Sequence, residues 1–195
     1  LQVLWGATHM LPPLAILHWP WSWWRNDYGP SQLNWMNVDI ETFDVMMCAA
    51  MVHRIGVSYP LPKLPERLRE RLSYHLQIFK DHIAPVLPTA TLLSLTDSPF
   101  RGNRGERNSA WQLTSNLNSV NEVHLVISLK LENSAQSAKF KPTQLEANQR
   151  YVVVDLETHN SSTVLGKELT GELLSEIAGN KNSWIVEIRP EKARL

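Results

Sequence analysis

The hydrophobic pattern of residues 39–83 predicts two amphipathic α-helices. Within residues 39–55, apolar side chains recur at spacings of three and four and share one helix face: Phe43, Met46, Met47, Ala50, Met51 and Ile55. Asp39 is a suitable N-cap for this helix, and Gly56 is a suitable stop. A second helix is expected from Pro65 to Ile83, with an apolar stripe and a solvated charged face.

From about residue 90 the pattern changes to short runs with the period of β-strands. The clearest run is 123–131, where alternate apolar residues face one side and His124, Ser128 and Lys130 face the other, as in a half-buried strand. Further strands are expected at 110–114, 151–156, 162–165 and 183–189, and a short helix at 167–177. Evenly spaced short strands favour an antiparallel β-sandwich. We therefore predict two units, residues 1–88 and residues 89–195.

The first 36 residues follow neither period, apart from one short buried strand expected at Val3–His9. Six of the eight tryptophans of the chain lie here: Trp5, Trp19, Trp21, Trp23, Trp24 and Trp35. Prolines and Gly29 interrupt regular structure, so we expect a long loop packed with aromatic side chains. Long loops in compact domains are usually functional or disordered, and the aromatic content argues against disorder.

The aromatic loop is the best candidate for ligand binding. Indole rings offer flat apolar faces for the C–H face of a sugar, and polar neighbours can hydrogen-bond its hydroxyls. The candidate substrate-binding residues are Trp5, His9, His18, Trp19, Trp21, Trp23, Trp24, Arg25 and Asp27. An equally strong alternative is that these tryptophans pack a structural lid. Asp27 is a weak acid/base candidate, because nothing marks a carboxylate pair of the kind that glycosidic cleavage needs.

Charge and composition exclude several other functions. Lys and Arg together number 19, as do Asp and Glu, so no basic excess points to nucleic acid or to an anionic membrane surface. No apolar run reaches the length of a membrane span. The single cysteine, Cys48, is expected in a helix core and allows neither an intrachain disulfide nor a cysteine metal site. His75 and His82 are better explained by helix packing than by a metal.

Two further expectations concern the origin of the chain and its ligands. No phosphate-binding loop, dinucleotide fingerprint or hydrolase elbow occurs, so no metal or cofactor is expected. Low cysteine usage favours the cytoplasm. The chain begins without Met, a basic leader or a cleavage pattern, as expected for an internal piece of a larger protein.

The order of these segments resembles the end of the catalytic barrel in family thirty-six glycoside hydrolases, the melibiase-type α-galactosidases. Trp5–His9 is similar to the Gly-x-His segment of the last barrel strand in that family. The helix leading into His53–Ser58, a Leu-Pro step and the helix ending at Phe79–Ile83 follow in the same order. Each motif is short, and it is their order that carries the resemblance.

The second half of the chain resembles the same family. Asn108–Gln112 is similar to the Asn-x-x-Ala-Trp strand that opens its C-terminal sandwich. Tyr151–Asp155 and Leu165–Leu169 are similar to its closing segments. The implied fold class is α+β: the end of a (β/α)8 barrel, comprising its last strand and helices, followed by an antiparallel β-sandwich.

The resemblance implies retaining hydrolysis of terminal α-galactosides by an aspartate nucleophile and an aspartate acid/base. In the family these lie in Lys-x-Asp and Trp-x-Ser-Asp segments upstream of the matched region, and neither occurs here. We therefore expect no catalytic residue in this chain and no hydrolysis by it alone. Its partners would be a carbohydrate substrate and the remainder of the barrel, whose absence should leave an exposed apolar face on residues 1–60; homo-oligomerisation stays open. The alternative is a non-catalytic carbohydrate-binding module that uses the aromatic loop.

Overall fold

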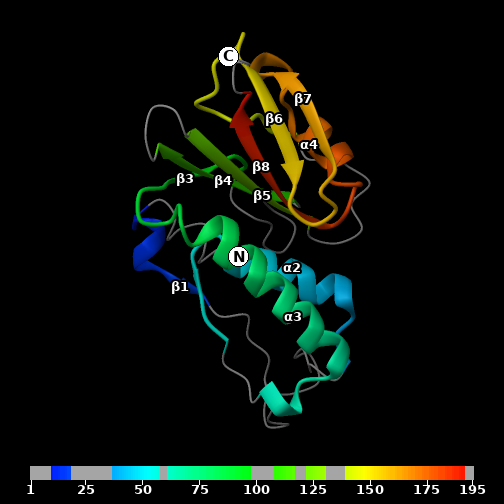
Figure 1. Cartoon of the computed structure of the whole chain (residues 1–195). Coiled ribbons are helices and arrows are strands. Elements are labelled where there is room, and N and C mark those ends of the chain that lie inside the picture. The colour runs from blue at the N-terminus through cyan, green and yellow to red at the C-terminus, as the bar shows by residue number, and fades with distance from the viewer. Residues whose placement is uncertain are drawn as a thin grey trace.

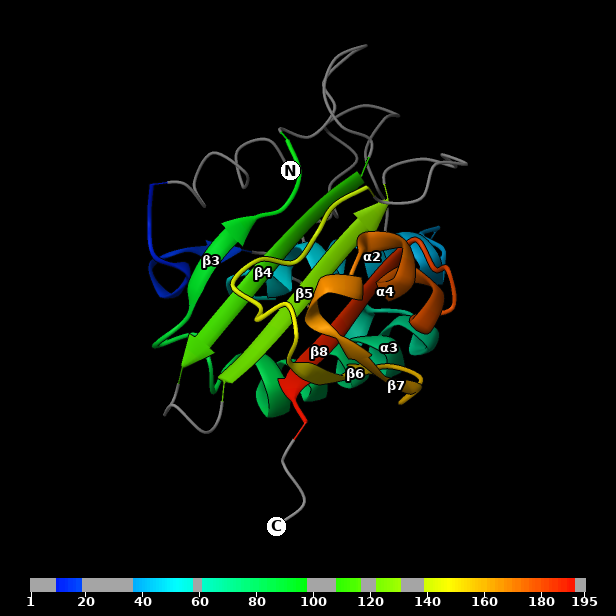
Figure 2. The ribbon, with the colours of Figure 1, turned by 90° about the horizontal axis from the view of Figure 1, so that it is seen from above.

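Helices cover both faces of one large β-sheet in the described part of the chain (Figures 1 and 2). This computed structural model describes residues 10–18, 37–57, 61–97, 108–116, 122–130 and 139–191. Helices α2 (Ile40–Met51) and α3 (Glu66–Ile78) lie on one face of the sheet, and α4 (Gly171–Ile177) lies on the other.

The two predicted helices are confirmed, with one change at the end of the first. The Asp39 side chain accepts a hydrogen bond from the backbone N–H of Thr42 at 2.7 Å, which is the expected N-cap. Helix α2 ends at Met51 rather than at Ile55, because Arg54–Ile55 forms strand β2. Gly56 therefore follows a strand and does not end the helix. Helix α3 continues into a π-helical turn, η4 (Phe79–Ile83), so the second prediction reaches the correct end.

The sheet contains six antiparallel strands in the order β3-β4-β5-β8-β6-β7. Their bounds are β3 Thr91–Ser94, β4 Asn108–Asn116, β5 Glu122–Lys130, β6 Arg150–Asp155, β7 Ser161–Leu165 and β8 Ser183–Pro190. The strands predicted at 110–114, 123–131, 151–156, 162–165 and 183–189 are present, while a possible strand around Lys139–Phe140 is not, and the predicted short helix is the 3-10 turn η5 (Gly166–Glu168) followed by α4. Strand β3 was not predicted.

Both faces of the central strands β4, β5 and β8 are buried, which corrects the half-buried strand predicted for residues 123–131. Trp111, Leu125 and Ile127 pack toward α2 and α3 in one apolar core. Val126 and Val186 belong to a second core on the opposite face, closed by α4 and by the segment before β6, through Phe140, Leu169, Leu174 and Ala178. The predicted polar face, including His124 and Ser128, is thus covered. The described strands of this unit form a single sheet, and no second sheet faces it within the described ranges.

A small parallel pair lies beside the helices, remote in sequence from the large sheet. Strand β1 (Leu17–His18) follows the 3-10 turn η1 (Pro13–Ala15) and pairs with β2. A further 3-10 turn, η3 (Leu61–Lys63), precedes α3. The predicted strand Val3–His9 lies outside the described residues. Residues from both sides of position 88 share the core between the helices and the sheet, and the predicted boundary there remains a prediction.

Candidate functional site

The predicted substrate-binding residues fall almost entirely outside the described residues. These are Trp5, His9, Trp19, Trp21, Trp23, Trp24, Arg25 and Asp27. His18 is described only in its backbone, as the last residue of β1. Their role in binding therefore stays a prediction, and the described residues around them supply the geometry that follows.

The aromatic segment, residues 19–36, joins two elements whose positions are fixed. It follows β1, whose residues Leu17 and His18 pair with Arg54 and Ile55 of β2. The backbone N–H of Arg54 also donates to the carbonyl of Ile16 at 3.2 Å. The segment leads to α2, whose first turn is fixed by the Asp39 cap. Both flanks of the candidate binding segment therefore belong to one small frame built from β1, α2 and β2.

The exposed large apolar side chains of the described residues all lie between positions 10 and 61 of the chain. We use the term apolar surface for Met10, Leu11, Leu14, Leu17, Ile40, Val57 and Leu61. Met10 is 83% exposed, and the others are between 37% and 51% exposed. No large hydrophobic side chain is exposed in the described part of the chain after Leu61. A folded domain normally scatters such residues, so their concentration in residues 10–61 distinguishes this part of the chain from the rest.

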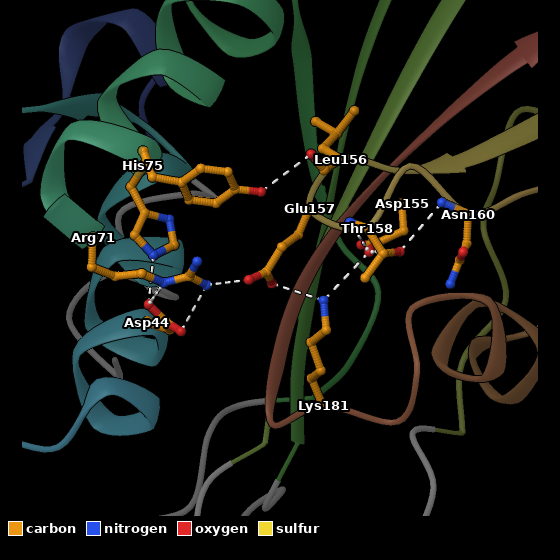
Figure 3. Close-up of polar contacts among 10 residues, drawn as sticks. Asp44, Arg71, His75, Asp155, Leu156, Glu157, Thr158, Asn160 and Lys181 are labelled. Carbon is orange, nitrogen blue, oxygen red and sulfur yellow. Dashed lines mark hydrogen bonds and ion pairs between the residues drawn. The ribbon is translucent and has the colours of Figure 1, made fainter.

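The most extensive ionic network of the described residues lies between the helices and the β6–β7 turn (Figure 3). Arg71 of α3 donates from Nε and a terminal nitrogen to the two carboxylate oxygens of Asp44 on α2, at 2.5 and 2.8 Å. The same guanidinium bonds Glu157 of the turn. Lys181 reaches Glu157 at 2.8 Å and Asp155 at 3.4 Å. His75 Nε2 lies 2.7 Å from Asp44 Oδ1.

The charges in this network stabilise one another. Burial raises the pKa of Asp44, but hydrogen bonds from His75 and Arg71 outweigh burial and leave that pKa below its usual value. The pKa of Glu157 is lowered in the same way, since bonds from Lys181 and Arg71 outweigh burial. The hydrogen bonds that Arg71 donates to Asp44 and Glu157 likewise outweigh burial and raise the pKa of Arg71. All three groups are therefore charged at neutral pH.

The network is a structural ion cluster rather than a reactive site. The cavity beside it, lined among others by Tyr74, His75 and Trp184, has room for about one water molecule and none for a sugar ring. Burial raises the pKa of the neighbouring Cys48 thiol to about 12, so this cysteine is not a nucleophile at neutral pH. Among the described residues no group of His, Cys, Asp and Glu is arranged to hold a metal ion. Likewise, no described helix combines the length and apolar character that crossing a membrane requires.

A second polar cluster lies on the opposite face of the sheet. Gln112 exchanges two hydrogen bonds with the backbone of Thr143, at 2.8 and 2.9 Å, and so attaches the covering segment to β4. Thr114 and His124 lie within 3.0 Å of each other beside it. Burial lowers the pKa of His124 to about 4, which keeps the imidazole neutral at physiological pH. The sequence pattern carries only a weak sign of this cluster, because the alternation in residues 123–131 assigns His124 to a solvated face.

Comparison with known proteins gives matches in structure only. No family model matches the chain, and no curated protein sequence matches it significantly. The galactosidase domain of an α-galactosidase–sucrose kinase, AgaSK, aligns over 97% of this chain and 24% of its own chain, with a TM-score of 0.64 and 12% identity. The α-galactosidase of Lactobacillus brevis aligns over 77% of this chain and 20% of its own, with a TM-score of 0.53 and 14% identity. The chain has the fold of a part of the GH36 α-galactosidases.

A further GH36 structure agrees with this result. A variant of the α-galactosidase AgaA from Geobacillus stearothermophilus, solved in complex with raffinose, aligns over 79% of this chain and 20% of its own, with a TM-score of 0.52 and 16% identity. The resemblance seen in the order of short sequence motifs is therefore confirmed at the level of the GH36 fold. The chain spans between 20% and 24% of the length of these structures. At such identities the likeness shows fold and leaves substrate and activity open.

Proposed function

We propose that this chain is the carboxy-terminal part of a retaining α-glycosidase that hydrolyses terminal α-galactosides. In this proposal residues 1–88 complete the catalytic barrel, and residues 89–195 form a non-catalytic β domain. The catalytic aspartates belong to the part of the enzyme upstream of the matched region. The likeness to GH36 α-galactosidases over 97% of the chain, but 24% of the AgaSK structure, supports this assignment.

The apolar surface is the observation that carries the proposal. Its residues all lie in the part assigned to the barrel, while the remaining described residues leave no large apolar side chain exposed. Strands β1 and β2 add a second argument, because they pair in parallel and are the two described strands of their sheet. Parallel sheets are normally buried on both faces and extended by further strands. Both features favour a neighbour that supplies more parallel strands.

The aromatic segment is proposed to line the substrate pocket. In a (β/α)8 barrel, the active site is built from loops at the carboxyl ends of the strands, and the aromatic segment comes after Val3–His9, the segment predicted as the last barrel strand. Its indole rings would stack on the sugar, while His9, His18, Arg25 and Asp27 would bond hydroxyl groups. We propose terminal α-galactose as the sugar, on the strength of the structural relatives.

Tryptophan fluorescence and turnover test this proposal together on the 195-residue chain. We expect no release of nitrophenol from an aryl α-galactoside, because the chain lacks the catalytic pair. Titration with melibiose, with lactose as the matched β-galactoside, reports sugar contact by the aromatic segment. Trp111 and Trp184 are 0% and 4% exposed and give a constant background.

The outcomes separate the candidate functions. Turnover by the chain alone would contradict the proposal. A strong, saturable response to melibiose without any upstream segment would favour the stand-alone carbohydrate-binding module. A weak response or none, without turnover, is expected of an incomplete pocket.

A further inference from the structure

We propose that Arg71 is the hub of an ionic latch that makes the helix layer, the β6–β7 turn and the α4–β8 loop open as one cooperative unit. The latch consists of Asp44, Arg71, His75, Asp155, Glu157 and Lys181 (Figure 3). It goes beyond the proposed function, since it does not depend on the identity of any substrate.

The latch joins segments that are far apart in the sequence. Arg71 and Asp44 are separated by 27 residues, and Arg71 and Glu157 by 86. Lys181 in turn donates a hydrogen bond to Asp155, the last residue of β6. One continuous series of ion pairs thus runs from α2 through α3 and the β6–β7 turn to the loop before β8.

Shared carboxylates make these contacts interdependent. Asp44 accepts from Arg71 with both oxygens and also contacts His75. Glu157 divides its two oxygens between Arg71 and Lys181. Because each carboxylate serves two partners, removing Arg71 leaves both Asp44 and Glu157 with incomplete compensation in a partly buried site. Such shared networks are where mutational effects stop being additive.

Burial makes the latch different from ion pairs on the surface. The side chains of Arg71 and Asp44 are 19% and 15% exposed, and that of Asp155 is 0% exposed. The Arg71 guanidinium also lies 4.7 Å from the centre of the Tyr74 ring, and the Tyr74 hydroxyl donates to the carbonyl of Leu156 at 3.4 Å. By contrast, the Arg150–Glu191 pair has side chains 56% and 42% exposed, so it offers a matched control.

The position of the latch gives it a consequence for the candidate site. Helix α2 carries Asp44, follows the aromatic segment and leads directly to β2. Holding α2 on the turn and loop therefore holds the frame that flanks the aromatic segment. The latch acts by positioning this frame and contacts no substrate.

Hydrogen exchange of the full 195-residue chain, followed by mass spectrometry, tests the latch. In Arg71→Met we expect exchange to accelerate about 10-fold or more, and together, in α2, in residues 155–160 and in residues 178–182. Arg150→Met should leave all three segments unchanged. Acceleration confined to α3, or none, would overturn the proposal.

Two measurements keep the proposal testable if Arg71→Met does not fold. In the unsubstituted chain, the three segments should show one common opening free energy as denaturant rises, and three separate values would contradict a single unit. Asp44→Asn and Lys181→Met form a double-mutant cycle on two residues that are connected through Arg71 and Glu157. We expect the effect of Lys181→Met on the unfolding equilibrium constant to change about 3-fold or more in the Asp44→Asn background. Additive effects would contradict coupling through Arg71.

Discussion

The large sheet and the small β1–α2–β2 frame bury their apolar side chains very differently. Both faces of the sheet are covered, by α2 and α3 on one side and by α4 with its neighbouring segment on the other (Figure 2). Among the described residues, the frame has a two-stranded parallel sheet and carries the apolar surface. The central strands of the large sheet are therefore covered by other described elements, whereas the frame leaves apolar side chains exposed, as we propose for an element that completes a larger fold.

Truncating the core of the sheet should produce the largest effect. Trp111 of β4 is fully buried between the sheet and the helices. Trp111→Ala should lower the free energy of unfolding by about 3–5 kcal/mol, through lost burial and a residual cavity. Urea denaturation measures this change. Leu61→Ala, at a side chain 48% exposed, is the matched control and should cost less than about 0.5 kcal/mol. Equal effects at both positions would remove the contrast between the two regions.

Acid should destabilise the sheet through His124. Its pKa is lowered from 6.5 to about 4 by burial, so the unfolded chain binds the additional proton first as the pH falls. Above pH 6.5 the neutral His124 imidazole leaves the free energy of unfolding undiminished. As the pH falls toward 4, the free energy of unfolding decreases by about 3 kcal/mol. Urea denaturation at a series of pH values measures this slope. His124→Gln should flatten it between pH 6.5 and 4, and an unchanged slope in that variant would refute the assignment to His124.

Below pH 4 the latch should weaken next. The pKa values of Asp44 and Glu157 are lowered in the fold, so their contribution is present above the ordinary carboxyl pKa and disappears as the pH falls through the lowered values.

At neutral pH, Arg71→Met should cost about 2 kcal/mol, less than for a fully buried pair because solvent still reaches the network. Arg150→Met should cost about 0.5 kcal/mol or less in the same urea titration. Equal losses in the free energy of unfolding for the two variants would contradict the claim that burial strengthens the latch.

Substitutions on the apolar surface should produce the smallest effect on stability. Leu14→Ser and Leu17→Ser replace side chains 43% and 49% exposed, so the free energy of unfolding should change by about 0.5 kcal/mol or less. A variant that carries both Leu14→Ser and Leu17→Ser should bind less of the hydrophobic dye ANS, because exposed apolar area is removed. A large loss of stability would show that these residues already pack within the chain, and the frame would then be complete.

The sequence predicted the elements that depend on local patterns. The Asp39 cap, helices α2 and α3, and most strands follow from spacing and capping chemistry. Strand β3 was missed because its four residues, Thr91–Ser94, are too few to show a period. The two-sided burial of β5 was missed because its cover comes from α4 and the segment before β6, and alternation within one strand does not register distant partners.

The candidate site was less predictable for a similar reason. Asp44 resembles an ordinary residue on the outer turn of a helix, and its role depends on Arg71 and His75, 27 and 31 residues away. Glu157 lies 86 residues from Arg71, so no local motif relates them. The aromatic segment, in contrast, stood out through composition alone. Its assignment to sugar binding remains a proposal that rests on the chemistry of indole rings.

Turnover by a longer product of the same coding region tests the central claim most directly. The 195-residue chain and the protein extended through the coding sequence before Leu1 would be assayed side by side with an aryl α-galactoside. The account predicts hydrolysis with retention by the extended protein and none by the chain alone. Turnover by the chain alone, or a folded extended protein without α-galactosidase activity, would contradict it.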